Sequence, residues 1–236
     1  MVEHGDTSEI HPAARRSITQ VDHALIAALA AIVGETAVLS TPEAREPFET
    51  DWRGSYSGIS IAVVCPKTTE EVSRVVRLCA DATTPIIVQG GNTSLCAGAT
   101  PDTTGTQVVL SLHRMRQVRM MDAGNACMTV EAGMVLAEAQ DLAARSDLLF
   151  PLSIASEGSA TVGGAISTNA GGVNVLHYGT MRALVLGVEA VLADGSIWSD
   201  LRQLRKDNTG YSISSLFSGA EGTLGIITAA SIALSP

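Results

Sequence analysis

The stretch Gly163-Gly164-Ala165-Ile166-Ser167-Thr168-Asn169-Ala170-Gly171-Gly172 contains two glycine pairs, and the interpretation of this chain starts from it. Paired glycines adopt positive φ at little cost and let the backbone pass close to a ligand. Their N–H groups can also form an anion-binding concavity. Earlier in the chain another glycine-rich loop, called the first glycine loop below, begins with Gln89-Gly90-Gly91-Asn92-Thr93-Ser94 and follows a strand-like segment at residues 85–88. Two such loops predict one extended ligand with a phosphate in its middle, and neither loop matches the dinucleotide fingerprint or the P-loop.

The composition is typical of a globular chain with an aliphatic core. Of the 236 residues, 46% are hydrophobic, 17% are charged and 3% are aromatic. A chain of this length can bury a core as one large domain or as two small subdomains. The net charge of −9, with no basic tract expected to interrupt the acidity, argues against a nucleic-acid partner. Phosphate binding is therefore expected to rest on backbone amides and helix N-termini.

Cysteine spacing and hydropathy predict a cytoplasmic chain. The acidic residues 1–8 lack the apolar stretch of a signal peptide, and the apolar run at 24–33 is about half the length that spans a bilayer. The cysteines show no C-x-x-C spacing, which indicates buried free thiols in a reducing compartment. Cys96, in the first glycine loop, is the one that could be exposed. The four cysteines are Cys65, Cys79, Cys96 and Cys127.

The first part of the chain is expected to alternate strands and helices. Thr68 and Glu71 have the spacing of a capping box, and apolar residues recur at helical spacing over 72–79. This helix joins apolar strands at 61–65 and 85–88. A strand–helix–strand unit implies a parallel pair with a right-handed crossover.

After the first glycine loop, the pattern changes to successive strands. Asp194-Gly195 is a hairpin turn signal. Helices are expected at 136–143 and 208–217. Strands are expected at 108–112, 117–121, 127–132, 184–193, 196–199 and 225–234.

Together these elements predict an α+β fold with mixed sheets, divided into two subdomains that meet near residues 100–110. Residues 1–18 are expected to form a flexible N-terminal tail, and residues 19–236 the folded domain. A helix over 19–32, ended by Gly34, begins this domain.

Four ordered segments resemble the FAD-linked oxidase family of the vanillyl-alcohol-oxidase or p-cresol-methylhydroxylase (PCMH) type. Within this family the chain is most similar to the D-2-hydroxyacid dehydrogenases, the branch that contains D-lactate, glycolate and D-2-hydroxyglutarate dehydrogenases. The resemblance covers about residues 52–236. The segments are Gln89-Gly90-Gly91-Asn92-Thr93, Gly163-Gly164 through Asn169-Ala170-Gly171-Gly172, Leu204-Arg205-Lys206-Asp207-Asn208-Thr209-Gly210-Tyr211, and Glu221-Gly222-Thr223-Leu224-Gly225-Ile226-Ile227.

The resemblance implies a PCMH-type FAD-binding domain and assigns roles to matching positions. Residues 90–94 would wrap the FAD pyrophosphate with main-chain N–H groups. Residues 158–179 would follow the pyrophosphate, the ribityl chain and the dimethylbenzene side of the flavin, and residues 221–227 would lie near adenine and ribose. The expected FAD-binding residues are Gln89, Gly90, Gly91, Asn92, Thr93, Ser94, Pro151, Gly158, Ser159, Val162, Gly163, Gly164, Asn169, Ala170, Gly171, Gly172, Tyr178, Gly179, Glu221, Gly222, Ile226 and Ile227.

The chain departs from the family pattern at four positions. Ser94 and Ala97 stand where relatives often have glycine, His177 where an arginine is common, and Ala220 where serine is usual. Ser94 matters most, because a Cβ in a tight loop changes how closely the pyrophosphate is held. No histidine lies in either glycine loop, so we expect FAD to be bound non-covalently.

The activity implied by the resemblance is hydride transfer from a D-2-hydroxy acid to FAD, which leaves the 2-oxo acid. In relatives, arginines hold the substrate carboxylate beside a histidine-rich cluster, in a C-terminal substrate domain that would begin after Pro236. The histidines of this chain have no metal-binding spacing, so we expect no metal site and assign no catalytic residue. They are His4, His11, His23, His113 and His177.

Three interpretations of the chain stay open at this point. The favoured one is the FAD-binding half of a D-2-hydroxyacid dehydrogenase whose substrate domain is absent from this sequence. The second is a complete flavin-binding subunit that needs a partner chain for the substrate site. The third is a non-enzymatic remnant of the fold. The expected partners are FAD and, through the missing domain or partner chain, a small 2-hydroxy acid, with no nucleic acid and no transmembrane segment.

Overall fold

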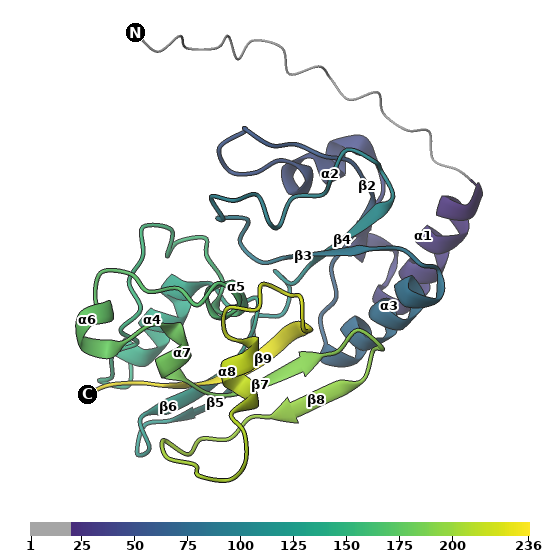
Figure 1. Ribbon diagram of the computed structural model, residues 1–236. Helices are drawn as coiled ribbons and strands as arrows, with labels where there is room; N and C mark the ends of the chain where they lie inside the picture. The colour runs from purple at the N-terminus through teal and green to yellow at the C-terminus, as the bar shows by residue number, and fades with distance from the viewer. Residues whose placement is uncertain (1–19) are drawn as a thin grey trace, which may run out of the picture.

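Two β-sheets and the helices packed on them make up the fold (Figure 1). The structure is a computed structural model that describes residues 20–236, so the expected tail, His4 and His11 lie outside the described residues. The helices are α1 (Gln20–Val33), the 3-10 helix η1 (Glu35–Ala37), α2 (Pro42–Glu49), α3 (Thr69–Asp81), α4 (Leu136–Ala144), α5 (Val162–Ser167), α6 (Val175–Tyr178), α7 (Met181–Leu184) and α8 (Ile213–Phe217). The strands are β1 (Val38–Leu39), β2 (Ser60–Val64), β3 (Ile86–Gln89), β4 (Gln107–Ser111), β5 (Val118–Asp122), β6 (Cys127–Glu131), β7 (Val185–Val191), β8 (Ile197–Asp200) and β9 (Ile226–Ala233).

The first sheet is mixed and has the strand order β1-β2-β4-β3. Strands β2 and β3 run parallel, as expected from the helix between them, but they are not neighbours: β4 lies between them and pairs with both. The expected direct pair is therefore wrong. The centre of this sheet is covered on both faces, and the fully buried run Val108–Leu110 fills it better than the half-exposed β3 does.

Helix α3 begins with a modified capping box. The Thr68 side chain accepts a hydrogen bond from the Glu71 N–H, as predicted. The Glu71 carboxylate, however, accepts from the Lys67 N–H at 2.7 Å and not from Thr68. The glutamate of the capping box thus reaches one residue further toward the N-terminus than usual. It accepts from a main-chain N–H that precedes the helix, as in the standard box.

The second sheet is antiparallel throughout, in the order β5-β6-β9-β7-β8. Strand β9, near the end of the chain, lies between β6 and β7, and all its residues are buried. The helix expected at 208–217 is shorter in the structure, where only α8 is helical in this range. The chain passes from one sheet to the other between Ser111 and Val118, and the proposed subdomain boundary at 100–110 stays a prediction.

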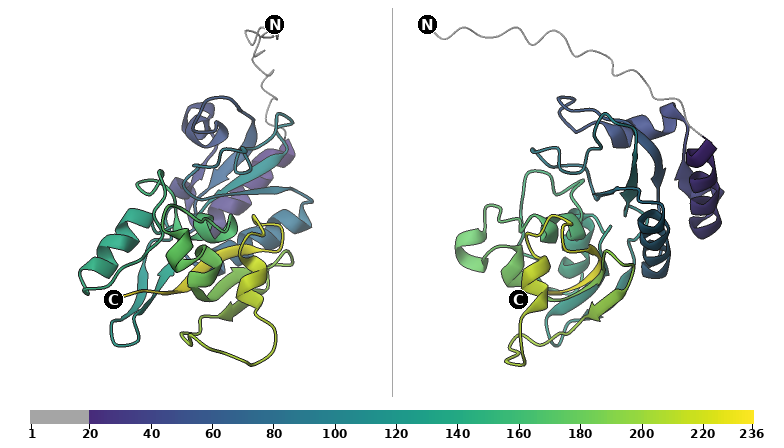
Figure 2. Two further views of the ribbon diagram at one scale, coloured as in Figure 1. Left: turned by 60° about the vertical axis from the view of Figure 1, so that its left-hand side comes forward. Right: turned by 45° about the vertical axis from the view of Figure 1, so that its right-hand side comes forward.

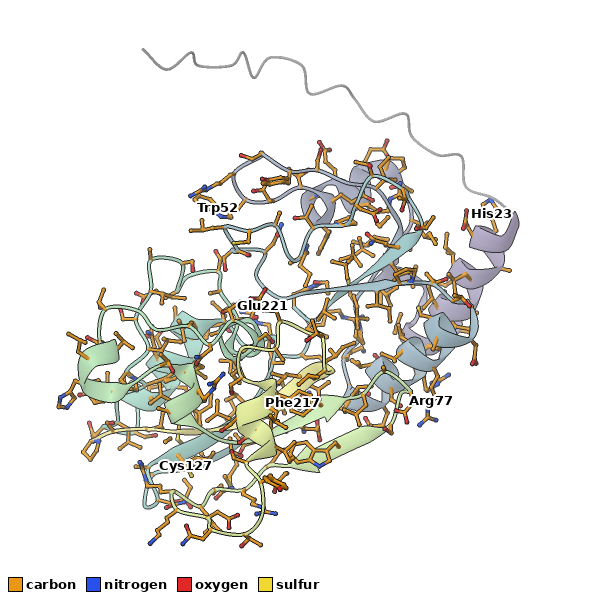
Figure 3. All side chains as sticks on the ribbon, in the orientation of Figure 1. His23, Trp52, Arg77, Cys127, Phe217 and Glu221 are labelled. Atoms are coloured by element: carbon orange, nitrogen blue, oxygen red, sulfur yellow. The ribbon has the colours of Figure 1, made fainter. Side chains whose placement is uncertain are left out.

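A polar stripe on α3 joins the two sheets. Thr69, Ser73 and Arg77 recur every four residues and therefore share one helix face. Thr69 donates to the Glu189 carboxylate at 2.6 Å. Ser73 and Arg77 both donate to the Gly195 carbonyl oxygen in the β7–β8 turn. Figure 3 shows Arg77 on this side of α3, beside the second sheet.

Glu189 is the centre of a hydrogen-bonded cluster under this stripe. Its carboxylate also accepts from Thr228, the extra residue of a bulge in β9, and pairs with Arg119 at 2.9 Å. Burial alone would raise the pKa of Glu189, but the hydrogen bonds from Thr69 and Thr228 and the charge of Arg119 outweigh it and lower the pKa. The cluster therefore favours a charged carboxylate at the junction.

The expectation that no basic tract interrupts the acidity is wrong, because residues 113–119 form a basic stretch. Each of its arginines makes a hydrogen bond or an ion pair within the protein. Arg114 donates to a main-chain carbonyl at the end of β2, Arg116 pairs with Glu138, and Arg119 pairs with glutamates of β6 and β7. The stretch therefore ties elements together and offers no free basic surface.

The cysteines follow the sequence prediction. Three are buried and Cys96 is exposed, and none forms a disulfide. Burial raises the pKa of Cys65 and of Cys79 to about 11. None of the helices within residues 20–236 has the length and hydrophobicity to cross a membrane.

Helices α1 and α3 pack side by side, with α1 on the first sheet and α3 also against β7 and β8 of the second, while α5, α7 and α8 gather on the second sheet (Figure 2). One continuous hydrophobic core joins the two sheets, and valine, leucine and alanine side chains dominate it, as the low aromatic content predicts. The connections that leave these two sheets form the cavity described next.

Candidate functional site

A cavity of about 410 Å3 lies where connections of the two sheets meet, and both glycine-rich regions reach it. Its wall comes from the loop after β3, from α5 with the segment before it, and from the turn that leads into β9. Figure 3 shows Glu221 of this turn near the middle of the molecule. Segments far apart in the sequence thus surround one space.

The first glycine pair brings the two regions into contact. A Cβ at Gly90 would lie 2.3 Å from Thr161 Oγ1, and a Cβ at Gly91 would lie 1.9 Å from the Ser159 carbonyl oxygen. A backbone carbonyl cannot rotate away, so the approach requires glycine at 91, whereas a side chain at 90 would push the Thr161 hydroxyl from its bond with the Gly164 N–H. Asn92 follows with φ of +51°, a conformation that asparagine adopts more readily than most residues.

The main-chain N–H groups of residues 91–95 have no hydrogen-bond acceptor within the described part of the chain. Most backbone donors in a folded protein have a partner, so a run of free donors in a half-buried loop is unusual. These residues line the cavity. Such a run of free N–H groups is suited to bind an anion such as a phosphate.

The second glycine region begins with helix α5, whose first N–H groups are already bonded. The Val162 N–H donates to the Met134 carbonyl, the Gly163 N–H to the Ala132 carbonyl, and the Gly164 N–H to Thr161 Oγ1. A Cβ at Gly163 would lie 2.6 Å from the Cβ of Ala132. This glycine pair therefore allows close packing of α5 on the sheet and offers few donors to a ligand.

The second glycine pair of this region, Gly171 and Gly172, lies outside the cavity wall. Gly172 has φ of +74°, and a Cβ there would lie 2.0 Å from the Ser153 carbonyl oxygen. The Val173 N–H donates to the same carbonyl. These contacts show that Gly172 lets the loop after α5 pack against Ser153.

The turn before β9 forms the third wall. Glu221 has φ of +50°, and its N–H donates to the Ser167 carbonyl at the end of α5. Its carboxylate lies 3.8 Å from the position of a Cβ at Gly98, in the loop after β3. Ile226 and Ile227 are buried and supply an apolar surface beside it. The turn thus combines one carboxylate with an apolar wall.

The expected FAD-binding residues fall into two groups. Those that line the cavity are Gly90, Gly91, Asn92, Thr93, Ser94, Gly163, Gly164, Ala170, Glu221, Gly222, Ile226 and Ile227. Those outside its wall are Gln89, Pro151, Gly158, Ser159, Val162, Asn169, Gly171, Gly172, Tyr178 and Gly179. Two of the second group support the wall: Gln89 bonds to Ala99, and Ser159 abuts Gly91.

Sequence reasoning missed one buried polar residue of the wall, Thr161. It is 4% exposed, caps α5 and touches the first glycine loop. A signal was present, because a threonine directly before a helical V-G-G segment has the position of an N-cap. Other unexpected lining residues are Val88, Leu95, Cys96, Gly98, Ala99, Leu112, Ala132, Ile154, Ser156, Ala160, Ala165, Ser167, Thr168 and Gly225.

The charges of the wall favour a ligand held by main-chain donors. Among residues 20–236, the cavity is lined by one carboxylate, that of Glu221, and by no lysine, arginine or histidine. The free N–H groups of 91–95 suit a phosphate, and the apolar wall at 226–227 suits a flat ring. This set matches a dinucleotide such as FAD, in which a pyrophosphate joins a nucleoside to a second ring system.

A family model for the FAD-binding domain matches residues 60–200, which is more than half of the chain. The chain belongs to this FAD-binding family. The resemblance drawn from the four motifs is therefore confirmed, and FAD is the cofactor that the family binds. The matched range contains both glycine regions, and it ends before the Glu221 turn.

Relatives at about 40% identity are named as enzymes of D-2-hydroxyglutarate. The chain is 39% identical over 230 residues to the mitochondrial D-2-hydroxyglutarate dehydrogenase of Bos taurus, covering 98% of the chain and 42% of the relative. It is 41% identical over 215 residues to that of Danio rerio, covering 91% and 39%. It is 38% identical over 230 residues to the D-2-hydroxyglutarate–pyruvate transhydrogenase of Saccharomyces cerevisiae, covering 96% and 46%. The chain thus spans less than half the length of these relatives.

Solved structures with the same fold are more distant in sequence. An alkyldihydroxyacetonephosphate synthase aligns with a TM-score of 0.79 at 20% identity. The alignment covers 98% of the present chain and 45% of the synthase chain. A p-cresol methylhydroxylase with bound substrate aligns with a TM-score of 0.78 at 23% identity and covers 94% and 45%. These likenesses confirm the PCMH-type α+β fold.

The expected cytoplasmic location is contradicted by the relatives, because the dehydrogenases from Bos taurus and Danio rerio are named as mitochondrial. The prediction rested on unpaired cysteines and on composition. Free thiols indicate that a compartment is reducing, but they do not identify which reducing compartment it is.

Proposed function

We propose that this chain is the FAD-binding half of a flavin-dependent oxidoreductase that oxidises a D-2-hydroxy acid to the 2-oxo acid. The names of the relatives support this reaction, and the FAD-binding family supplies the cofactor. Bound FAD would accept the hydride from the α-carbon of the substrate, since flavins carry out such electron chemistry.

The observation that carries the proposal is the run of free N–H groups at residues 91–95 on the cavity wall. In the proposal these groups bind the pyrophosphate, whose negative charge no basic side chain of the wall balances. The Glu221 carboxylate, which only accepts hydrogen bonds when ionised, would accept from ribose hydroxyls. Ile226 and Ile227 would pack against adenine. No histidine lines the wall within 20–236, so the link to FAD is proposed to be non-covalent.

The groups that hold the substrate are proposed to come from outside this chain. A 2-hydroxy acid carries a carboxylate, and the cavity wall within the described residues offers no cation to bind it. Groups of three or more metal-ligating side chains are likewise not found in 20–236. A C-terminal substrate domain would complete the site, and a partner chain is the alternative.

Reconstitution tests the proposal in two steps. The purified chain is titrated with FAD, and the bound flavin is then released by acid precipitation and identified. We expect a yellow complex that releases free FAD. A chain that cannot be reconstituted would contradict the cofactor site, and flavin retained in the precipitate would contradict the non-covalent link.

The second step measures reduction of the bound flavin by D-2-hydroxyglutarate and D-lactate. We expect no reduction by this chain alone and rapid reduction when the chain is extended by the substrate domain of a relative. Rapid reduction by this chain alone would show that the catalytic groups lie within it. Rescue only by a separately expressed subunit would favour the partner-chain alternative.

A further inference from the structure

The first glycine loop, residues 90–98, has few internal bonds to hold its shape. The N–H groups of 91–95 are free, and the Cys96 N–H donates to the hydroxyl of Ser94. A loop whose donors are kept for a ligand cannot be ordered by those same donors. Some other group must fix the loop before the ligand arrives, or binding would include the entropy cost of ordering it.

Gln89 has the position and bonds for this task. It is the last residue of β3, is 2% exposed and lies outside the cavity wall. Its amide nitrogen donates to the Phe48 carbonyl at 2.9 Å and to the Ala99 carbonyl at 2.9 Å. One side chain thus joins the two ends of the loop and ties them to the end of α2.

Asn92 supplies a second tie within the loop. Its amide nitrogen donates to the Thr50 carbonyl at 2.7 Å, which directs the side chain away from a ligand and toward the residue after α2. This bond lies directly beside the free N–H groups. Gln89 and Asn92 therefore attach the loop to the same short segment, residues 48–50.

That segment is itself attached to β2 by buried hydrogen bonds. Arg45, buried in α2, donates to the Ser60 and Ile61 carbonyls. Glu49 accepts from the Ser60 N–H at 2.6 Å and from its hydroxyl at 2.7 Å, and lies 3.3 Å from Arg45. A continuous chain of buried polar contacts thus runs from β2 through the end of α2 to the loop.

We propose that Gln89 and Asn92 are positioning residues that hold the first glycine loop in its anion-binding shape by anchoring it to α2. Their amides do not contact the ligand, and they act through the free N–H groups of residues 91–95. This inference rests on the proposed FAD site. It assigns Gln89 a structural task where the family resemblance implied a contact with FAD.

Replacement of Asn92 by glycine separates the hydrogen bond from the backbone conformation. Glycine adopts the φ of +51° freely, so Asn92→Gly removes the bond to Thr50 without adding strain. We expect the Kd for ADP, a probe that carries the pyrophosphate, to rise about five- to tenfold, which is the usual effect of one lost hydrogen bond. Calorimetric titration well below the melting temperature keeps nearly all of the protein folded.

Replacement of Gln89 by glutamate gives the stronger test. The shape is kept, but an ionised carboxylate would face the Phe48 and Ala99 carbonyls without a donor. We expect the Kd for ADP to rise by more than about thirtyfold, because buried acceptors are then left unpaired. The control matched to Asn92→Gly is Asn125→Gly, which removes a hydrogen bond from the amide of Asn125, in the β5–β6 turn, to the Gln203 carbonyl after β8; neither residue lines the cavity.

Hydrogen exchange of the ligand-free protein distinguishes positioning from general destabilisation. Both loop variants are expected to exchange faster in the peptide that covers residues 90–98, with β6 and β9 unchanged. Equal exchange, or an ADP affinity equal to that of the Asn125→Gly control, would overturn the inference. If the unaltered chain binds neither ADP nor FAD, the proposed site itself fails, which is a different outcome.

Discussion

The two glycine-rich regions look alike in sequence, but the main-chain N–H groups are free in one and bonded within the protein in the other. In the loop after β3, the N–H groups of 91–95 are free, and the side chains of Gln89 and Asn92 fix the backbone. In α5, the N–H groups of residues 162–164 are bonded within the protein. The first region is therefore a set of donors kept in place by a scaffold, and the second is a tightly packed wall.

Paired glycines in a sequence therefore indicate that the backbone closely approaches another group. They do not indicate whether donors remain there for a ligand or serve packing within the protein. Gly91 approaches Ser159 so that two loops can meet, whereas Gly163 approaches Ala132 so that α5 can pack on the sheet. The surrounding bonds decide whether donors remain for a ligand. Substitutions in the two regions should therefore separate ligand affinity from stability.

The largest effect is expected for Gly91→Ala. Its methyl group would lie 1.9 Å from the Ser159 carbonyl oxygen, a backbone atom that cannot rotate away. The two loops must separate, and the free donors move with them. We expect FAD affinity to fall by more than about a hundredfold and the free energy of unfolding to fall by about 2–3 kcal/mol. FAD titration and urea denaturation measure the two effects.

Gly124→Ala is the matched control for that change. The nearest atom to a Cβ at this position is Asp122 Oδ1 at 3.5 Å, an ordinary contact distance, and its φ is not in the left-handed region. Gly124 lies in the β5–β6 turn and does not line the cavity, so affinity and stability should stay at the values of the unaltered chain. A control that lost FAD as Gly91→Ala does would show that the loss does not depend on the contact with Ser159.

A smaller effect, of a different kind, is expected for Gly163→Ala. The added methyl group would lie 2.6 Å from the Ala132 Cβ and push α5 from the sheet. We expect a loss of about 1–3 kcal/mol in the free energy of unfolding. FAD affinity should fall much less than in Gly91→Ala, because the donors of this region are already used. An equal loss of affinity in both variants would contradict the comparison.

The junction of the two sheets offers a pH-dependent test. The pKa of Glu189 is lowered in the folded protein, so its charged form adds stability that is present above the ordinary glutamate pKa and is lost as the pH falls through the lowered value. Glu189→Gln should be less stable by about 1–2 kcal/mol at pH 7. The difference in urea midpoint should shrink as the pH falls through the acidic range, and a constant difference would contradict this account.

The smallest effect concerns the thiols. Cys96 is exposed on the cavity wall, whereas Cys65, Cys79 and Cys127 are buried with a raised pKa. At pH 8 one thiol should react with Ellman's reagent at least about tenfold faster than the rest. FAD should slow this reaction, and a Cys96→Ser variant should lose the fast phase. Rapid reaction of several thiols in the native protein would contradict the described burial.

Local patterns predicted most elements but not their neighbours in the sheets. The helices α1, α3 and α4 and the hairpin at Gly195 follow from periodicity and turn signals. The insertion of β4 between β2 and β3 does not, because residues 107–111 pair across the long loop that contains the first glycine pair. Sheet order depends on which apolar run fills the centre, and that is a property of the whole core.

The sequence by itself determined the family, the cofactor and the α+β class, because these depend on ordered motifs and on periodicity. The tertiary structure alone decided which glycines border the cavity, that Gln89 bonds to Phe48 and Ala99, and that Thr161 joins the two regions. The physical reason is that a hydrogen-bond donor becomes a ligand-binding group only when no acceptor of the folded chain reaches it. That depends on contacts between residues far apart in the sequence, which local patterns do not encode.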